Sequence, residues 1–145
     1  MVSEINKIQQ SPEWRSTAIV LAYDDSDGWY DHVSSQIVNG SHDAAQDQAV
    51  CTAKPVKLAG QADRCGYGPR LPLLLISPFS KVNFVDHTQT DQTSVLRFIE
   101  DNWFTGRIGD ASFDTRAGGL WNMFDFWWPQ ARKLNLDPKS GAEVR

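Results

Sequence analysis

The order of apolar and polar positions predicts two short buried strands. The run from Thr17 to Tyr23 is almost continuously apolar and has the length of a strand. A run without period-two alternation is typical of a strand buried on both faces, as in a parallel sheet. A second apolar run, from Leu71 to Ile76, is broken by Ser77 and Pro78. We expect this run to form a second buried strand.

A helical pattern follows the second strand. From Asp91 to Trp103, apolar residues recur at intervals of three and four, namely Val95, Leu96, Phe98, Ile99 and Trp103. This spacing predicts a helix that packs its apolar face on the sheet, with Asp91 or Thr90 as the N-cap.

Two segments lack a regular pattern. Residues 39–70 are rich in Gly, Ser, Asp, Gln and Ala and are expected to be mostly loop. Residues 106–145 form a tail that glycines interrupt and that carries many aromatic residues, which we interpret mainly as packing residues. Pro129 should end or prevent a helix that begins near Leu120. The last residues, Leu134 to Arg145, are polar and expected to be extended or frayed.

Composition and charge argue against some classes of binding partner. A length of 145 residues suits one domain with an adequate core. The net charge is -4 and no Lys/Arg cluster occurs, so nucleic acid is not an expected partner. No apolar run approaches the roughly twenty residues that span a bilayer. The segment from Met1 to Gln10 is too polar for a signal peptide.

The two cysteines lie in the loop-rich segment. Thirteen residues separate Cys51 from Cys65, and a disulfide between them would close a loop that is poor in apolar residues. In the chain-entropy model such a cross-link contributes about 3 kcal/mol. Two free thiols in a reducing compartment are the alternative. A zinc site is disfavoured because no second ligand pair stands at finger spacing, although His42 lies nearby.

Acidic residues gather directly after the first predicted strand. Asp24 and Asp25 follow its apolar residues, and Asp27 and Gly28 come next. Open α/β sheets place their sites beyond the carboxyl ends of strands. Adjacent carboxylates in a crevice raise each other's pKa, and a bound cation offsets their repulsion. Asp24 and Asp25 could therefore share one divalent metal ion. The alternative is a turn, because loops favour Asp, Ser and Gly.

Five blocks of the sequence occur in a fixed order: a first block made of Ser11–Trp14, Ser16–Val20 and Tyr23–Val33, and then Gly66–Pro72, Ile76–Thr88, Ser94–Trp103 and Asp110–Phe126. Together they cover almost the whole chain. In this order and spacing they resemble the bacterial phosphoesterase family that holds phospholipases C and related acid phosphatases. The resemblance implies an α/β fold of the alkaline-phosphatase type, with a mostly parallel sheet flanked by helices. Residues 1–145 would be the carboxyl-terminal part of one such catalytic domain.

The resemblance also implies an activity. Members hydrolyse phosphate esters with a divalent metal ion and a Ser or Thr nucleophile. We therefore expect phospholipase C cleavage of phospholipids of the phosphatidylcholine type, with acid phosphatase as the other parent activity. The family's paired metal-ligand aspartates correspond to Asp24 and Asp25. Its Glu-Asn metal-binding pair and its nucleophile lie in a preceding amino-terminal half, which this chain would need as a partner.

The resemblance leaves three origins open: a deliberately shortened product, a truncated gene product, or one half of a split gene. The chain could accordingly be a non-catalytic remnant that associates with a separate amino-terminal half. The full-length parent would be secreted or periplasmic, with its signal upstream of Met1.

Other residues are weaker candidates for the site. His32 and His87 each follow an aspartate. For His32 a structural hydrogen bond in the loop is the favoured interpretation, and His87 could equally prepare the start of the following helix. Ser77 does not lie in a Gly-x-Ser-x-Gly turn, which argues against a serine-hydrolase triad. Trp29 and Tyr30 could offer aromatic faces to a choline headgroup, although packing of the loop is the simpler use.

Overall fold

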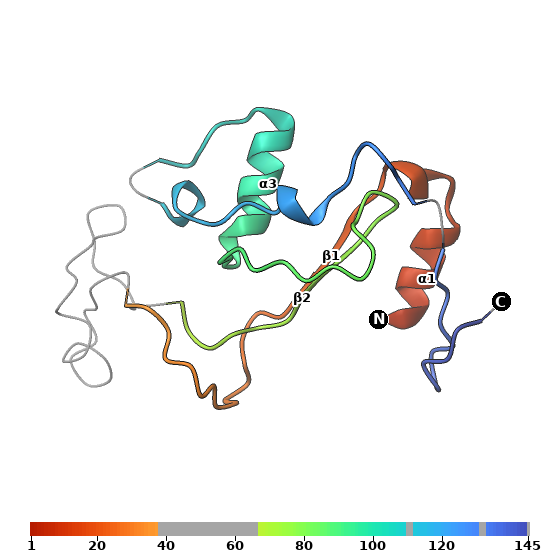
Figure 1. Cartoon of the computed structure of the whole chain (residues 1–145), viewed down its shortest axis with the longest axis horizontal. Coiled ribbons are helices and arrows are strands. Elements are labelled where there is room, and N and C mark those ends of the chain that lie inside the picture. The colour runs from red at the N-terminus through yellow and green to blue at the C-terminus, as the bar shows by residue number, and fades with distance from the viewer. Residues whose placement is uncertain (38–66, 110–111, 131–132, 145) are drawn as a thin grey trace. The chain divides into compact units, whose positions relative to one another are not determined.

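The computed structural model describes residues 1–37, 67–109, 112–130 and 133–144 (Figure 1). Within these ranges the elements are α1 (Val2–Gln10), β1 (Ile19–Ala22), β2 (Leu73–Ile76) and α3 (Thr93–Trp103), with 3-10 turns at Pro12–Ser16, Phe113–Thr115 and Trp121–Met123. The chain thus mixes α and β structure. Most of the loop-rich segment 39–70, including Cys51 and Cys65, lies outside the described residues, so the disulfide stays a prediction.

The chain divides into two compact units. Unit 1 comprises Met1–Leu21, Leu73–Asp86 and Trp121–Arg145. Unit 2 comprises Ala22–Pro72 and His87–Leu120.

The two predicted strands form, and they pair with each other. β1 and β2 run in opposite directions in a two-stranded sheet (Figure 1). This antiparallel pairing differs from the parallel pairing expected of β1. The strands are also less buried than predicted, since Ile19, Val20 and Leu21 are half-buried and Leu74 is exposed. In a sheet of only two strands, each strand has a single neighbour. The mostly parallel sheet expected of the larger domain stays a prediction.

Aromatic side chains pack beside the end of β2 in unit 1. The ring of Phe124 is buried and stacks on Phe126 at 5.1 Å, and Phe126 lies 5.5 Å from Phe79. Backbone bonds from Lys81 to Met123 and from Asp125 to Phe79 join the two segments. Part of the aromatic tail therefore packs as expected. Trp127 and Trp128 do not, because they are 88% and 76% exposed.

Helix α1 holds the end of the chain through two side-chain amides. Asn6 donates to the Leu136 carbonyl at 2.7 Å and accepts from the Leu136 amide at 3.2 Å. One turn later, Gln9 exchanges the same two bonds with Leu134, both at 2.9 Å. Leu136 then forms an antiparallel bridge with Glu143. Of the two expectations for this tail, fraying is therefore wrong, while Leu136 and Glu143 are extended and paired.

Unit 2 is built around α3. The helix begins two residues after its expected start, yet Asp91 acts as the cap, because its carboxylate accepts from the Thr93 amide at 2.8 Å. The helix contacts the Phe113–Thr115 turn, and its buried residues are Ser94 and Glu100. The predicted apolar face is covered only in part, because Val95, Leu96 and Phe98 are half-buried whereas Ile99 and Trp103 are 44% and 64% exposed.

Candidate functional site

The segment after β1, which we call the acidic segment (residues 23–31), folds as consecutive tight turns. Asp25 Oδ1 accepts from the Asp27 amide at 2.5 Å, and the Trp29 amide donates to Ser26 at 2.9 Å. Asp27 and Gly28 both have positive φ, at 49° and 80°, which Asp and Gly tolerate best. The turn interpretation of this sequence is therefore correct as local structure. It leaves the carboxylates of Asp24 and Asp25 exposed.

A glutamine holds the beginning of the acidic segment. Gln92 Nε2 donates to the Tyr23 carbonyl at 3.2 Å and also to the Asp24 carbonyl. Gln92 directly precedes α3, and Asp91 beside it is bonded twice: its carboxylate accepts from the Thr93 amide at 2.8 Å, and its amide donates to Ser94 Oγ at 3.0 Å. The bonded start of α3 thus holds the backbone of Tyr23 and Asp24 through an exposed glutamine.

An ion pair holds the end of the acidic segment. Arg70 donates from Nε to Asp31 Oδ2 at 2.9 Å and from Nη2 to Oδ1 at 2.8 Å. The Arg70 and Val33 amides add bonds of 2.8 and 3.0 Å. The Arg70 guanidinium, followed by these two amides, holds the pKa of Asp31 well below its usual range. Sequence reasoning missed this pair, because no local spacing relates residues that are 39 positions apart.

The remaining sequence candidates lie outside such networks or have structural roles. His32 is exposed, with Nδ1 4.0 Å from Asp31 Oδ1, and His87 is exposed as well. Ser77 Oγ donates to the Thr17 carbonyl at 2.8 Å and accepts from the Phe79 amide, which makes it a structural residue. Trp29 and Tyr30 are exposed beside a shallow hollow that Gly68 also lines, so their expected packing role is not observed.

Asp24 and Asp25 are suitable ligands for a divalent metal ion, but two residues are too few for a complete site. Carboxylate oxygens suit hard cations and are also accepted by zinc. In the part of the chain that the structure describes, no cluster of three His, Cys, Asp or Glu side chains could complete a site. These two residues would therefore supply part of a coordination shell.

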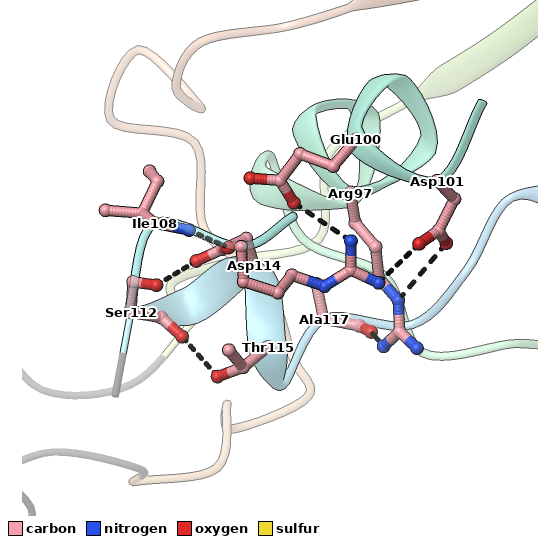
Figure 2. Close-up of polar contacts among 9 residues, drawn as sticks. Arg97, Glu100, Asp101, Ile108, Ser112, Asp114, Thr115 and Ala117 are labelled. Atoms are coloured by element: carbon pink, nitrogen blue, oxygen red, sulfur yellow. Dashed lines mark hydrogen bonds and ion pairs between the residues drawn. The ribbon is translucent and has the colours of Figure 1, made fainter. Parts of the chain in front are cut away.

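A second polar network joins α3 to the turn at residues 113–115 (Figure 2). Arg107 binds Glu100 Oε2 at 3.2 Å and Asp101 Oδ1 at 2.5 Å. Asp114 accepts from the Ile108 amide at 3.0 Å and from the Ser112 hydroxyl. Burial and the neighbouring Asp114 carboxylate raise the pKa of Glu100. The Ser112 hydroxyl and the Ile108 amide lower the pKa of Asp114. The network connects elements of unit 2 and contains none of the predicted metal ligands.

No helix among the described residues is long and apolar enough to cross a membrane.

Comparison with known proteins agrees with the resemblance seen in the sequence. The chain is 33% identical over 137 residues to a non-hemolytic phospholipase C of Burkholderia pseudomallei, a match that covers 88% of this chain and 19% of that protein. It is 34% identical over 126 residues to a hemolytic phospholipase C of Pseudomonas aeruginosa, covering 84% and 17% of the two chains. Phospholipase C B of Mycobacterium tuberculosis is 29% identical over 135 residues, covering 86% and 24%.

The chain thus spans about a fifth of the length of the curated relatives that it matches. The sequence pattern of the Phosphoesterase family matches residues 1–105. This match includes β1, the acidic segment, β2 and α3. The expected family is therefore confirmed, and the chain belongs to the Phosphoesterase family.

Proposed function

We propose that this chain takes part in metal-dependent hydrolysis of phosphate esters, as the metal-binding part of a phospholipase C that acts on phosphatidylcholine-type phospholipids. One observation carries the proposal. In a chain of the Phosphoesterase family, two adjacent exposed carboxylates, Asp24 and Asp25, lie just past the end of β1. The relatives named above are phospholipases C. Acid phosphatase remains the alternative parent activity.

In this proposal Asp24 and Asp25 are ligands of a divalent metal ion. When bound, the ion would polarise phosphate oxygens and stabilise the negative charge that develops on them. The acidic segment presents both carboxylates to solvent, while its internal turn bonds fix the backbone that carries them. The nucleophile and the remaining ligands would come from an amino-terminal half, and the two halves would together form the alkaline-phosphatase-like parallel sheet. The complete enzyme would be secreted or periplasmic.

An association role is the second candidate. Ile99 and Trp103 of α3, and Phe104 directly after it, are exposed, and exposed apolar groups of this kind mark surfaces that bind another protein. The chain would then be a half-enzyme or a non-catalytic remnant that associates with a separate amino-terminal half.

The test compares three preparations with a p-nitrophenyl phosphodiester: the chain alone, the chain with added divalent metal, and the chain with the amino-terminal half of a relative. We expect no turnover above background without the other half, because an oriented nucleophile contributes about 7 to 11 kcal/mol to lowering the barrier. Activity that appears only with both halves supports a split site. Metal-dependent turnover by the chain alone, lost in Asp24→Asn, would show that the nucleophile lies in this chain.

A double variant tests the ligand assignment in the reconstituted enzyme. Asp24→Asn with Asp25→Asn should abolish metal retention and hydrolysis. The fold should persist, because an asparagine at position 25 keeps an oxygen that can accept from the Asp27 amide. Asp27→Asn is the matched control, since Asp27 is exposed in the same segment and asparagine tolerates its positive φ. Normal turnover in the double variant would refute the assignment.

A further inference from the structure

The acidic segment is held at both of its ends by side chains from elsewhere in unit 2. Gln92 binds the carbonyls of Tyr23 and Asp24 at the beginning. Arg70 binds Asp31 at the end. The two anchor residues approach from different parts of the sequence, one before α3 and the other shortly before β2. Arg70 has no atom that binds a cation, and Gln92 donates from Nε2 to two backbone carbonyls, so both residues contact the acidic segment rather than a metal ion.

The Arg70 anchor is a bidentate ion pair in which the Arg70 side chain is 65% exposed. Two parallel N–H bonds between a guanidinium and a carboxylate fix both the distance and the plane of the pair. The Asp31 side chain is only 11% exposed and accepts four hydrogen bonds in all. A lysine at position 70 would keep the charge and lose the planar fork.

The backbone on both sides of Gln92 is held by hydrogen bonds. Asp91 caps α3 through the Thr93 amide, and Ser94, which accepts from the Asp91 amide, is fully buried. Gln92 lies between these bonded residues, so its backbone is held in place. From there its side chain reaches the Asp24 carbonyl.

We propose that Arg70 and Gln92 are positioning residues, which hold the acidic segment at its two ends so that Asp24 and Asp25 present their carboxylates to one divalent cation in a fixed arrangement. This inference rests on the proposed function. Partners that orient metal ligands typically change metal affinity by about 10- to 100-fold when they are substituted. The anchors act on the backbone of the ligand segment rather than on the ligand oxygens.

The test uses the chain reconstituted with the amino-terminal half of a relative, with Mn²⁺ as the probe and electron paramagnetic resonance to count free Mn²⁺. Arg70→Lys and Gln92→Met should each weaken Mn²⁺ binding by about tenfold. Arg15→Lys is the control, because Arg15 is an exposed arginine of unit 1. A purely structural anchor would lower the melting temperature and leave the dissociation constant unchanged where both proteins are folded.

Amide exchange gives a second readout that needs no metal. The Asp27 and Trp29 amides are bonded inside the acidic segment, and both should exchange about tenfold faster in Arg70→Lys if this anchor suppresses local opening. Unchanged exchange together with unchanged Mn²⁺ affinity would overturn the inference. If the double variant Asp24→Asn with Asp25→Asn loses Mn²⁺ binding while both anchor variants behave as the parent chain, the positioning role of Arg70 and Gln92 is refuted. The ligand role of Asp24 and Asp25 then stands. Full Mn²⁺ binding by that double variant would refute the ligands themselves.

Discussion

Gly118 is the position where one added methyl group should disturb unit 2 most clearly. A Cβ built on Gly118 would lie 2.0 Å from the Gln89 carbonyl oxygen, 2.9 Å from Thr88 Cγ2 and 3.0 Å from the Gln89 carbonyl carbon. The closest of these atoms belongs to the backbone, so it cannot move away by a rotamer change. Gly118→Ala must therefore displace the segment that leads into α3.

The expected change in the free energy of unfolding has two parts, the clash in the folded state and the restriction of the unfolded chain by alanine. Overpacking typically costs about 1 to 3 kcal/mol, and a clash with a backbone atom belongs at the upper end of that range. Alanine also stabilises by about 0.4 to 1 kcal/mol, because it restricts the unfolded chain more than glycine does. We therefore expect a net loss of about 2 kcal/mol, which corresponds to roughly 4 to 8 °C in melting temperature at this size.

Gly106→Ala is the matched control for this measurement. Gly106 has a φ of 80° and no atom within 4 Å of a built Cβ, so alanine there meets backbone strain without a clash. That strain costs about 1 to 2 kcal/mol, partly offset by the same unfolded-chain term. Thermal melting followed by circular dichroism should give a lower melting temperature for Gly118→Ala than for Gly106→Ala. Equal melting temperatures for Gly118→Ala and the parent chain would refute the close approach of residues 88–89 to Gly118.

Two further predictions concern the Glu100 network and the cysteines. Because the folded-state pKa of Glu100 is raised, its favourable contribution is complete below its ordinary pKa and is lost as pH rises through the raised value. Denaturant unfolding from about pH 4 to pH 7 should therefore show Glu100→Gln gaining stability relative to the parent chain as pH rises, and a constant difference would contradict the raised pKa. Cys51 and Cys65 should be joined in protein from an oxidising compartment, so non-reducing mass spectrometry of alkylated secreted protein that found two free thiols would rule the disulfide out.

Local patterns predicted the elements well, and non-local contacts escaped them. The apolar runs located β1 and β2 to within about two residues, and Asp91 was correctly expected to cap α3. The direction of strand pairing was predicted wrongly, because a continuous apolar run is typical of parallel sheets and also occurs in buried strands of antiparallel sheets. The Arg70 to Asp31 pair depends on chain closure over 39 positions, which no periodicity encodes.

Burial of α3 was predicted only in part, for a related reason. Periodicity identified an apolar face, of which Val95, Leu96 and Phe98 are half-buried while Ile99 and Trp103 are exposed. Burial also depends on which neighbours are present, and Glu100 is buried although it is charged, with Arg107 as its partner. The acidic residues after β1 were found from the sequence, whereas the anchors at the two ends of their segment were visible only in three dimensions.

The amide pairs between α1 and Leu134–Leu136 have a consequence for the order of folding. Asn6 and Gln9 bond to backbone groups that lie 130 and 125 residues further along the chain. Contacts this distant in sequence slow folding, because the intervening chain must be ordered before they form. We therefore expect the bonds between α1 and Leu134–Leu136 to form late, after the segments between them have folded.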